Sequence, residues 1–245
     1  MPAPILEAQG SFTIAHICYF AASLESYQVD LAVWVMVVRP ERCPHCGGEH
    51  TYVLWGSYLR WVYTSTDRIQ IRIQRVRCRR CGVTDALLPS FLHTFRRYTL
   101  TLIQQAIFLA LDGGLWGKAL VDVIGPYYQP APATIREWVW SFALSAAWLL
   151  TWLQQSLTTL DPLATLDPGR PPAHLLGIPH PRRSHAFLQA WQTLRLAETL
   201  YAAVRTRQPN LAFQADMLLA FLAAVLGSAG RIPRLLWPQA QTRAP

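Results

Sequence analysis

The stretches Cys43-Pro-His-Cys46-Gly-Gly and Cys78-Arg-Arg-Cys81-Gly decide how the middle of this 245-residue chain folds. Each places two cysteines three positions apart and follows them with a glycine. A tight turn of this form presents two thiolates to one ion, and the glycine accepts the positive φ that the turn requires. The 31 residues between the pairs leave room for two strands that bring the pairs together. Because closed sulfur coordination selects zinc, we expect one structural zinc ion held by Cys43, Cys46, Cys78 and Cys81.

Three other interpretations of the four cysteines are open: unrelated pairs, a CxxC redox centre, and local disulfides. A redox CxxC usually opens a helix, whereas these pairs flank a strand pattern. No basic segment followed by an apolar run opens the chain, so we expect a cytoplasmic, reducing location in which disulfides are rare. His45 and His50 could each replace a thiolate, but with four cysteines present we expect both histidines to be solvated. We expect Cys18 to be a small buried apolar residue.

The segment between the cysteine pairs has the pattern of a β-hairpin. Strands are expected over residues 51–63 and 68–74, joined by a turn at Thr64-Ser-Thr-Asp67. Apolar and polar residues alternate along the second strand, and Val76 is an apolar residue at a position where this alternation predicts a polar one. We therefore expect a bulge, or the end of pairing, near Gln74-Arg75.

After Pro89 the spacing of apolar residues becomes helical. Helices are expected over residues 98–111, ended by Asp112-Gly-Gly114, and over 118–124. A third helix is expected to start with a capping box at Thr134-Ile-Arg-Glu137. Its period predicts which side chains point inward (Ile135, Trp138, Val139, Phe142 and Ala146) and which point outward (Arg136, Glu137, Trp140 and Ser141).

Six prolines between residues 161 and 183 indicate a linker that separates two folded parts. Two helices are expected beyond it, over residues 187–204 and 211–226, the second apolar on all sides. No apolar stretch is long and uninterrupted enough for an ordinary membrane span, so no membrane partner is expected. The expected architecture is α+β: an N-terminal strand and helix leaning on the ribbon (1–38), a small four-cysteine zinc ribbon built on a β-hairpin (39–95), a helix-turn-helix-like three-helix unit (96–160), a proline-rich linker (161–183), and a C-terminal helical pair with a tail (184–245).

Positive charge gathers around the cysteines. Residues 39–98 hold eleven arginines and four acidic residues, a net of +7 in a chain whose total is +8. Such a surplus favours a polyanionic partner, and we expect DNA. Trp55, Tyr58 and Trp61 stand on the strand opposite the arginines and can stack on bases or sugars. The residues expected to contact DNA are Arg68, Arg72, Arg75, Arg77, Arg79, Arg80, Arg96, Arg97, Arg136 and Ser141.

The charge also permits other interpretations. The strand arginines could form an ordinary solvated face, and part of their surplus could balance four thiolates around one zinc ion. The three helices could be a plain packing unit, because the connection over residues 125–133 is longer than the turn of a typical helix-turn-helix.

A resemblance to a known family rests on five stretches: the two cysteine motifs, Trp55-Gly-Ser-Tyr-Leu-Arg60, Ala86-Leu-Leu-Pro-Ser-Phe91 and Thr134-Ile-Arg-Glu-Trp138. Together they resemble the zinc-ribbon and helix-turn-helix module that begins bacterial insertion-sequence transposases. The chain looks most similar to short bacterial proteins of unknown function that keep this module without a transposase core. The resemblance covers residues 40–145. It implies recognition of DNA at the ends of mobile elements by Arg72, Arg75, Arg77, Arg79, Arg80 and Arg136.

A transposase core itself is not expected. Strand transfer requires three carboxylates that hold two metal ions, and after residue 146 only Asp161, Asp167, Glu198 and Asp216 remain. Two of these fall in the proline-rich segment and two on apolar helices. We therefore expect a DNA-binding, nucleoid-associated protein that is not an enzyme. The alternative is a zinc-ribbon scaffold for protein–protein contacts, including a homodimer formed through the C-terminal helices.

Overall fold

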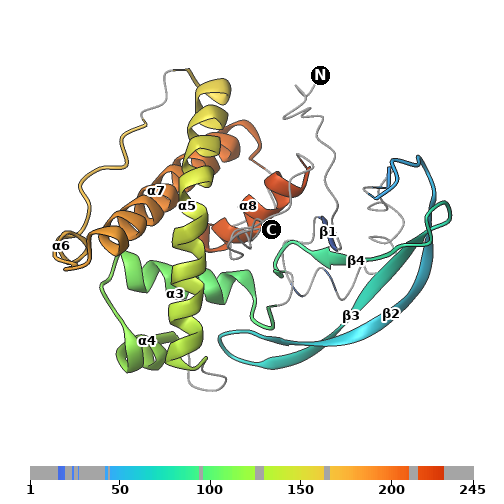
Figure 1. Cartoon of the computed structure of the whole chain (residues 1–245), viewed down its shortest axis with the longest axis horizontal. Coiled ribbons are helices and arrows are strands. Elements are labelled where there is room, and N and C mark those ends of the chain that lie inside the picture. Colours follow the sequence, from blue (N-terminus) through green and yellow to red (C-terminus); the bar gives the residue numbers. More distant parts are fainter. Residues whose placement is uncertain are drawn as a thin grey trace, which may run out of the picture. The chain divides into compact units, whose positions relative to one another are not determined.

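A computed structural model describes residues 16–19, 24, 27, 42–43, 45–93, 96–124, 130–162, 166–209 and 215–228. The chain divides into two compact units. Unit 1 comprises residues 1–100 and 219–233, and unit 2 comprises residues 101–218 and 234–245. Unit 1 contains the strands and unit 2 is helical (Figure 1). The predicted α+β class is confirmed.

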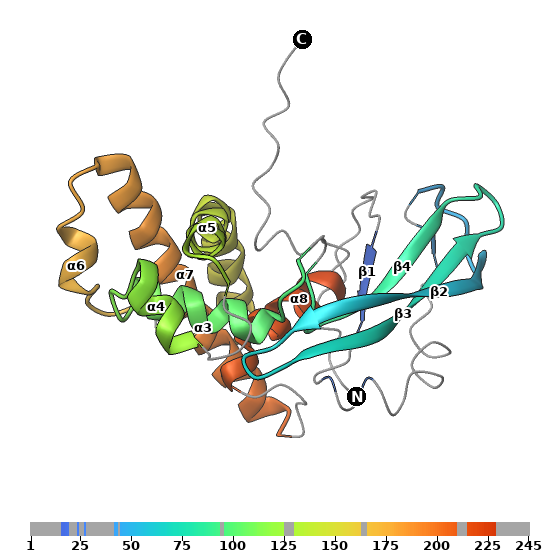
Figure 2. The same ribbon diagram turned by 90° about the horizontal axis from the view of Figure 1, so that it is seen from below.

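A four-stranded sheet forms the centre of unit 1, with the order β1-β4-β3-β2 (Figure 2). β2 pairs antiparallel with β3, β3 pairs antiparallel with β4, and β1 pairs parallel with β4. The predicted hairpin is confirmed, and the Thr64 amide donates to the Asp67 carbonyl at 2.9 Å in its turn. The strands are β1 (His16–Tyr19), β2 (Tyr52–Tyr63), β3 (Arg68–Cys78) and β4 (Thr84–Pro89).

The bulge expected in the hairpin is present near Arg75. Leu54 pairs with Val76 and Ser57 pairs with Gln74, so Trp55 and Gly56 together face one residue. The extra residue therefore lies on β2, and Gly56 takes the positive φ of 77° that this bulge needs. The shift in register lets β3 bury both Ile73 and Val76 despite their different parity.

Strand β4 was not predicted from the sequence. Residues 85–89 are all buried, so the strand shows no alternation of apolar and polar side chains. The predicted N-terminal strand is confirmed as β1. The hydroxyl of Tyr27 donates to the Arg72 carbonyl at 2.5 Å, which ties the N-terminal segment to the sheet. Most of residues 1–38, including 31–38, lie outside the described residues, as does the side chain of Cys18.

Helices α3 to α7 make up unit 2, while α8 belongs to unit 1. The predicted end of α3 is confirmed: Gly114 has a φ of +65°, and the Leu115 amide donates to the Leu109 carbonyl at 2.9 Å. In the next helix Val123 is exposed, while Leu120 and Ile124 are buried. The helices are α3 (Leu100–Leu111), α4 (Gly117–Ile124), α5 (Pro132–Leu160), α6 (Ala173–Leu176), α7 (Pro181–Arg207) and α8 (Leu218–Ser228).

The long helix α5 corrects two predictions. It begins at Pro132, two residues before the expected capping box, and its first residue has no side-chain cap. Ser141 was expected to point outward, yet it is only 4% exposed. The reason is that α5 also packs against α7, where the Thr193 hydroxyl donates to the Ala146 carbonyl at 3.2 Å. Helix α5 therefore buries side chains on more than the one face that its period predicted. The five residues predicted to point inward are all buried.

The proline-rich segment differs from the predicted linker. It contains α6 and the start of α7, whose Pro181 occupies the first turn, where proline is tolerated. Helices α5 and α7 belong to the same unit, so the segment does not separate two folded parts. Helix α8 is apolar on all sides as predicted and belongs to unit 1, whereas α7 belongs to unit 2. Within the described ranges, no helix combines the length and apolarity that crossing a membrane requires.

Candidate metal centre

The two cysteine motifs fold into matching turns. In the first, the Gly47 amide donates to the Cys43 carbonyl at 2.8 Å, and Gly47 has a φ of +66°. In the second, the Gly82 amide donates to the Cys78 carbonyl at 2.9 Å, and Gly82 has a φ of +76°. Each glycine thus stands at the position where an L side chain would be strained. The spacing of the motifs encoded this geometry.

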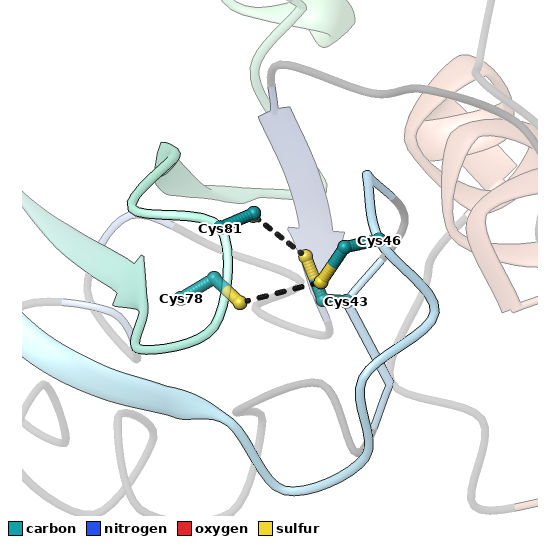
Figure 3. A group of neighbouring side chains, drawn as sticks. All are labelled: Cys43, Cys46, Cys78 and Cys81. Atoms are coloured by element: carbon teal, nitrogen blue, oxygen red, sulfur yellow. Dashed lines mark hydrogen bonds between the residues drawn. The ribbon is translucent and has the colours of Figure 1, made fainter.

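The four cysteine side chains converge on one point (Figure 3). The sulfur atoms of Cys43 and Cys81 lie 3.8 Å apart, and those of Cys46 and Cys78 lie 3.7 Å apart. All four ligand atoms lie within 4.8 Å of one another. A tetrahedron with metal–sulfur bonds of about 2.3 Å has edges of about 3.8 Å, so the cluster fits a single tetrahedral metal ion. A disulfide requires sulfurs about 2.05 Å apart, and the four thiols are free.

Hydrogen bonds around the cluster bias the ionisation of its thiols. Burial opposes ionisation of Cys78, but hydrogen bonds from the Thr51 hydroxyl, at 3.1 Å, and from the Cys81 amide lower the pKa of Cys78 to about 6. Cys81 behaves in the opposite way. A hydrogen bond from the Val83 amide favours its thiolate, yet burial and the neighbouring sulfurs raise the pKa of Cys81 to about 12. Four adjacent thiolates are therefore unfavourable without a cation between them.

A buried carboxylate stabilises the first cysteine turn through a hydrogen bond to the histidine of that turn. Asp85, on β4, is 1% exposed, and its carboxylate lies 3.0 Å from Nε2 of His45. The buried Tyr52 hydroxyl donates to the same carboxylate. Burial, followed by this hydrogen bond, raises the pKa of Tyr52 above its ordinary value, so the hydroxyl stays a donor. His45 is thus held between two cysteines by Asp85, and the expectation that it is a solvated residue is wrong.

The sequence did not reveal this supporting network. Asp85 is an acidic residue inside an apolar stretch, and this was the available indication that it is buried and partnered. Its partners, Tyr52 and His45, are 33 and 40 residues away along the chain, so only the sheet brings them together.

Four of the nine predicted DNA-contacting arginines, Arg68, Arg72, Arg75 and Arg77, lie on strand β3 of the hairpin. Residues directly opposite each other in an antiparallel pair share a face. Leu59 is opposite Arg72, and Trp61 is opposite Gln70, on the face directed away from the core. Beyond the bulge, Arg77 joins this side through its contact with Trp55. We call this surface the outer face of the hairpin: Trp55, Leu59, Trp61, Arg68, Arg72 and Arg77.

Arginine and tryptophan side chains pair on the outer face. The guanidinium of Arg68 lies 4.0 Å from the centre of the Trp61 ring, and that of Arg77 lies 4.4 Å from the Trp55 ring. Trp55 is 49% exposed and Trp61 is 42% exposed. Tyr58, which was grouped with these tryptophans, instead pairs with the buried Ile73 and shares its face. The outer face is therefore both cationic and aromatic.

The remaining predicted contacts are distributed between the two units. Arg75, Arg79 and Arg80 are exposed at the end of β3 and on the second cysteine turn. Arg97 is exposed and Arg96 is half-buried beside the end of β2, where the Arg97 carbonyl accepts from the Tyr63 amide at 2.8 Å. Arg136 and Ser141 belong to unit 2. Ser141 is buried and cannot contact DNA, whereas Arg136 is exposed and lines a cavity.

A family model matches the cysteine-bearing part of the chain. Residues 43–110 match a family model described as a domain of unknown function, DUF6431. The match includes all four cysteines, strands β2 to β4 and most of α3. No curated protein and no solved structure matches the chain. This region is thus similar to DUF6431 and carries a four-cysteine cluster that can hold one metal ion, while the link to transposases stays a prediction.

Proposed function

We propose that the sheet of unit 1 is a zinc-stabilised module that binds DNA through the outer face of the hairpin. The observation that carries this proposal is the pairing of exposed tryptophans with arginines at 4.0 and 4.4 Å. Arginine neutralises phosphates, and exposed aromatic rings stack on bases or sugars. The resemblance to transposase N-terminal modules supports a role at the ends of mobile elements, and we place the protein with the nucleoid in the cytoplasm.

The acidic residues near the hairpin do little to offset its charge. Glu49 forms an ion pair with Arg42, and Asp85 is buried with Tyr52 and His45. Asp67 lies in the hairpin turn, where it accepts from the Arg68 amide at 2.6 Å. Glu41 lies outside the described residues. Asp67 offsets at most one of the three arginine charges of the outer face, so a net positive charge remains available to phosphates.

Zinc is the metal that the donor set favours. Four thiolates form a soft, closed set, and the sulfur separations match tetrahedral zinc. A closed site leaves no position for water or substrate, so its role is structural. Together with the absence of a carboxylate triad from the sequence, this supports a binding protein rather than an enzyme.

Binding of zinc is expected to release about two or more protons at pH 7. Cys78, with a pKa of about 6, is already a thiolate at this pH, while the raised pKa values of Cys46 and Cys81 keep those thiols protonated. Because protons compete with the metal, zinc affinity should fall as the pH falls. Calorimetric titration of metal-free protein with zinc, in two buffers of different ionisation enthalpy, measures the number released. Release of less than one proton would contradict this account of the site.

DNA binding is expected to weaken steeply with salt. Each phosphate contact contributes about 0.9 to the slope of log affinity against log salt concentration. Replacing Arg72 and Arg77 by glutamine should therefore reduce the slope by about 2, and Trp61→Ala should weaken binding by about tenfold through lost stacking. The matched control is Arg170→Gln, an exposed arginine of unit 2. Fluorescence anisotropy with a mixed-sequence duplex at several salt concentrations measures both effects. Absence of binding at low salt would contradict the proposal.

A second candidate function, protein–protein binding, rests on the exposed apolar side chains of β2. On the outer face, β2 exposes the apolar surface of Trp55, Leu59 and Trp61, and β2 is an edge strand of the sheet. Exposed apolar patches of this kind also serve protein–protein contacts. On this alternative the zinc module is a scaffold for a partner or for a homodimer, and the C-terminal helices remain a predicted dimer contact. Sedimentation at two protein concentrations, with wild type and Leu59→Ser, distinguishes it: a dimer that Leu59→Ser dissociates, with no duplex binding, would favour the scaffold.

A further inference from the structure

Unit 2 contains a cavity of about 680 Å³ that the proposed function does not use. Its residues come from the loop after α3, the N-terminal parts of α5 and α7, and the region of α6. Three aromatic side chains, Trp116, Trp140 and Phe187, form what we call the aromatic wall. Arg136, Arg183 and His174 supply the polar groups. The volume lies in the range typical of small-molecule sites.

The aromatic wall presents flat apolar surface to the cavity. Phe187 links the other two rings: its centroid lies 5.6 Å from that of Trp116 in a tilted arrangement, and 5.9 Å from that of Trp140 in an edge-on arrangement. Contacts of this kind hold the three rings in defined orientations. A planar ring can therefore stack on them with little loss of side-chain freedom.

The polar side of the cavity favours an anion. Arg136 lies in α5 and Arg183 in α7, each close to the N-terminus of its helix. The positive end of a helix dipole adds to a nearby cation, and neither helix has an acidic residue in its first turn or a side-chain cap. In the part of the chain that the structure describes, neither arginine forms an ion pair with a carboxylate. A bound anion would relieve this concentration of positive charge.

The loop after α3 fixes the position of the third polar group. Nε2 of His174 donates to the Leu111 carbonyl at 3.1 Å, because a carbonyl oxygen can only accept. A Cβ atom added to Gly114 would lie 3.2 Å from Nδ1 of the same ring, and the φ of Gly114 is +65°. Glycine at position 114 therefore permits both the loop conformation and the close approach of the ring. These contacts hold His174 in place at this edge of the cavity.

We infer that this cavity binds a nucleotide, with the base against the aromatic wall and the phosphate between Arg136 and Arg183. A nucleotide combines the two features that the cavity selects, a planar ring and a group with up to two negative charges. Two guanidiniums suit a phosphate because each forms paired, charge-assisted hydrogen bonds with it. The nucleotide can be free or can belong to a single strand of nucleic acid, since the chemistry recognised is the same.

Calorimetric titration of the full-length protein with AMP, GMP, CMP and UMP tests this inference. At least one monophosphate should bind with a Kd of about 1 mM or lower. Arg136→Gln and Arg183→Gln should each weaken binding by about tenfold or more, and Trp140→Ala should do the same through lost stacking. Arg170→Gln, an exposed arginine that does not line the cavity, should leave binding unchanged. Both cavity arginines are exposed, so circular dichroism of the glutamine variants should match that of the wild type.

The outcomes separate this inference from the proposed function. Failure of all four monophosphates to bind would overturn it, as would binding that the three cavity substitutions leave unchanged. Trp61→Ala, on the outer face of the hairpin, should not affect binding of the monophosphate, and Arg183→Gln should not affect binding of the duplex. A short single-stranded oligonucleotide that displaces the bound monophosphate identifies a strand as the source of the nucleotide, and lack of displacement identifies the free nucleotide.

Discussion

Cys78→Ser is expected to eliminate stoichiometric zinc and to unfold the sheet of unit 1. The Cys78 sulfur is completely buried, receives the Thr51 hydrogen bond and lies 3.7 Å from the Cys46 sulfur. Structural zinc contributes about 10–16 kcal/mol in small zinc-binding domains at pH 7, which equals or exceeds the total stability of a typical domain. Loss of one zinc ligand should therefore cost more free energy than the total folding stability of the sheet. Elemental analysis measures the zinc, and hydrogen exchange of the amides in β2 to β4 measures the folding of the sheet.

Cys18→Ser is the matched control for this experiment. Cys18 lies in β1 and is not a member of the four-cysteine cluster. The variant should keep one zinc ion per chain. A chelator that removes zinc from the wild type should reproduce the effect of Cys78→Ser on hydrogen exchange. Retention of a full equivalent of zinc by purified, folded Cys78→Ser protein would refute the proposed ligand set.

Asp85→Ala is expected to destabilise unit 1 by about 3 kcal/mol or more. The substitution removes the carboxylate that His45 and Tyr52 share, and it leaves the Tyr52 hydroxyl buried without that acceptor. His45 lies between Cys43 and Cys46, so release of its ring should also loosen the first cysteine turn and weaken zinc binding. Denaturant unfolding, monitored through the tryptophans of β2, measures the loss of stability.

Tyr52→Phe provides the comparison for Asp85→Ala. It removes only the hydroxyl and leaves the hydrogen bond between His45 and Asp85 in place. The expected loss is about 1–2 kcal/mol, since one hydrogen bond to a charged group is removed while the aromatic ring still fills its place. If both variants lost the same small amount, Asp85 would not be the centre of the network.

Local sequence patterns predicted those parts of the fold that depend on neighbouring residues. The CxxC-Gly spacing dictates the geometry of each cysteine turn, and the parity change at Val76 predicted the bulge at the right place. The bulge was expected near Gln74-Arg75, but its extra residue belongs to β2. The alternation of apolar and polar residues along β3 indicates that the pairing changes. Only the register with the partner strand shows which of the two strands contains the extra residue.

The predictions that were wrong concern residues whose burial depends on a segment far away in the sequence. The period of α5 placed Ser141 outward, but Ser141 is buried, on a helix that also packs against α7. Proline content indicated a separating linker over residues 161–183, although Pro181 begins a helix that packs against α5. Strand β4 shows no alternation because both its faces are covered. In each case the deciding partner is remote in the sequence.

The amino-acid sequence alone was sufficient to predict the four-cysteine cluster, the hairpin and the concentration of arginine around the cysteines, because these depend on spacing and composition over short distances. Long-range packing, in contrast, is what brings Asp85 to the first cysteine turn, stacks arginines on Trp55 and Trp61, and places Arg136 beside a cavity with an aromatic wall. Each of these contacts joins side chains that lie far apart along the chain or on neighbouring strands. Their positions depend on register and helix packing, which no local pattern encodes.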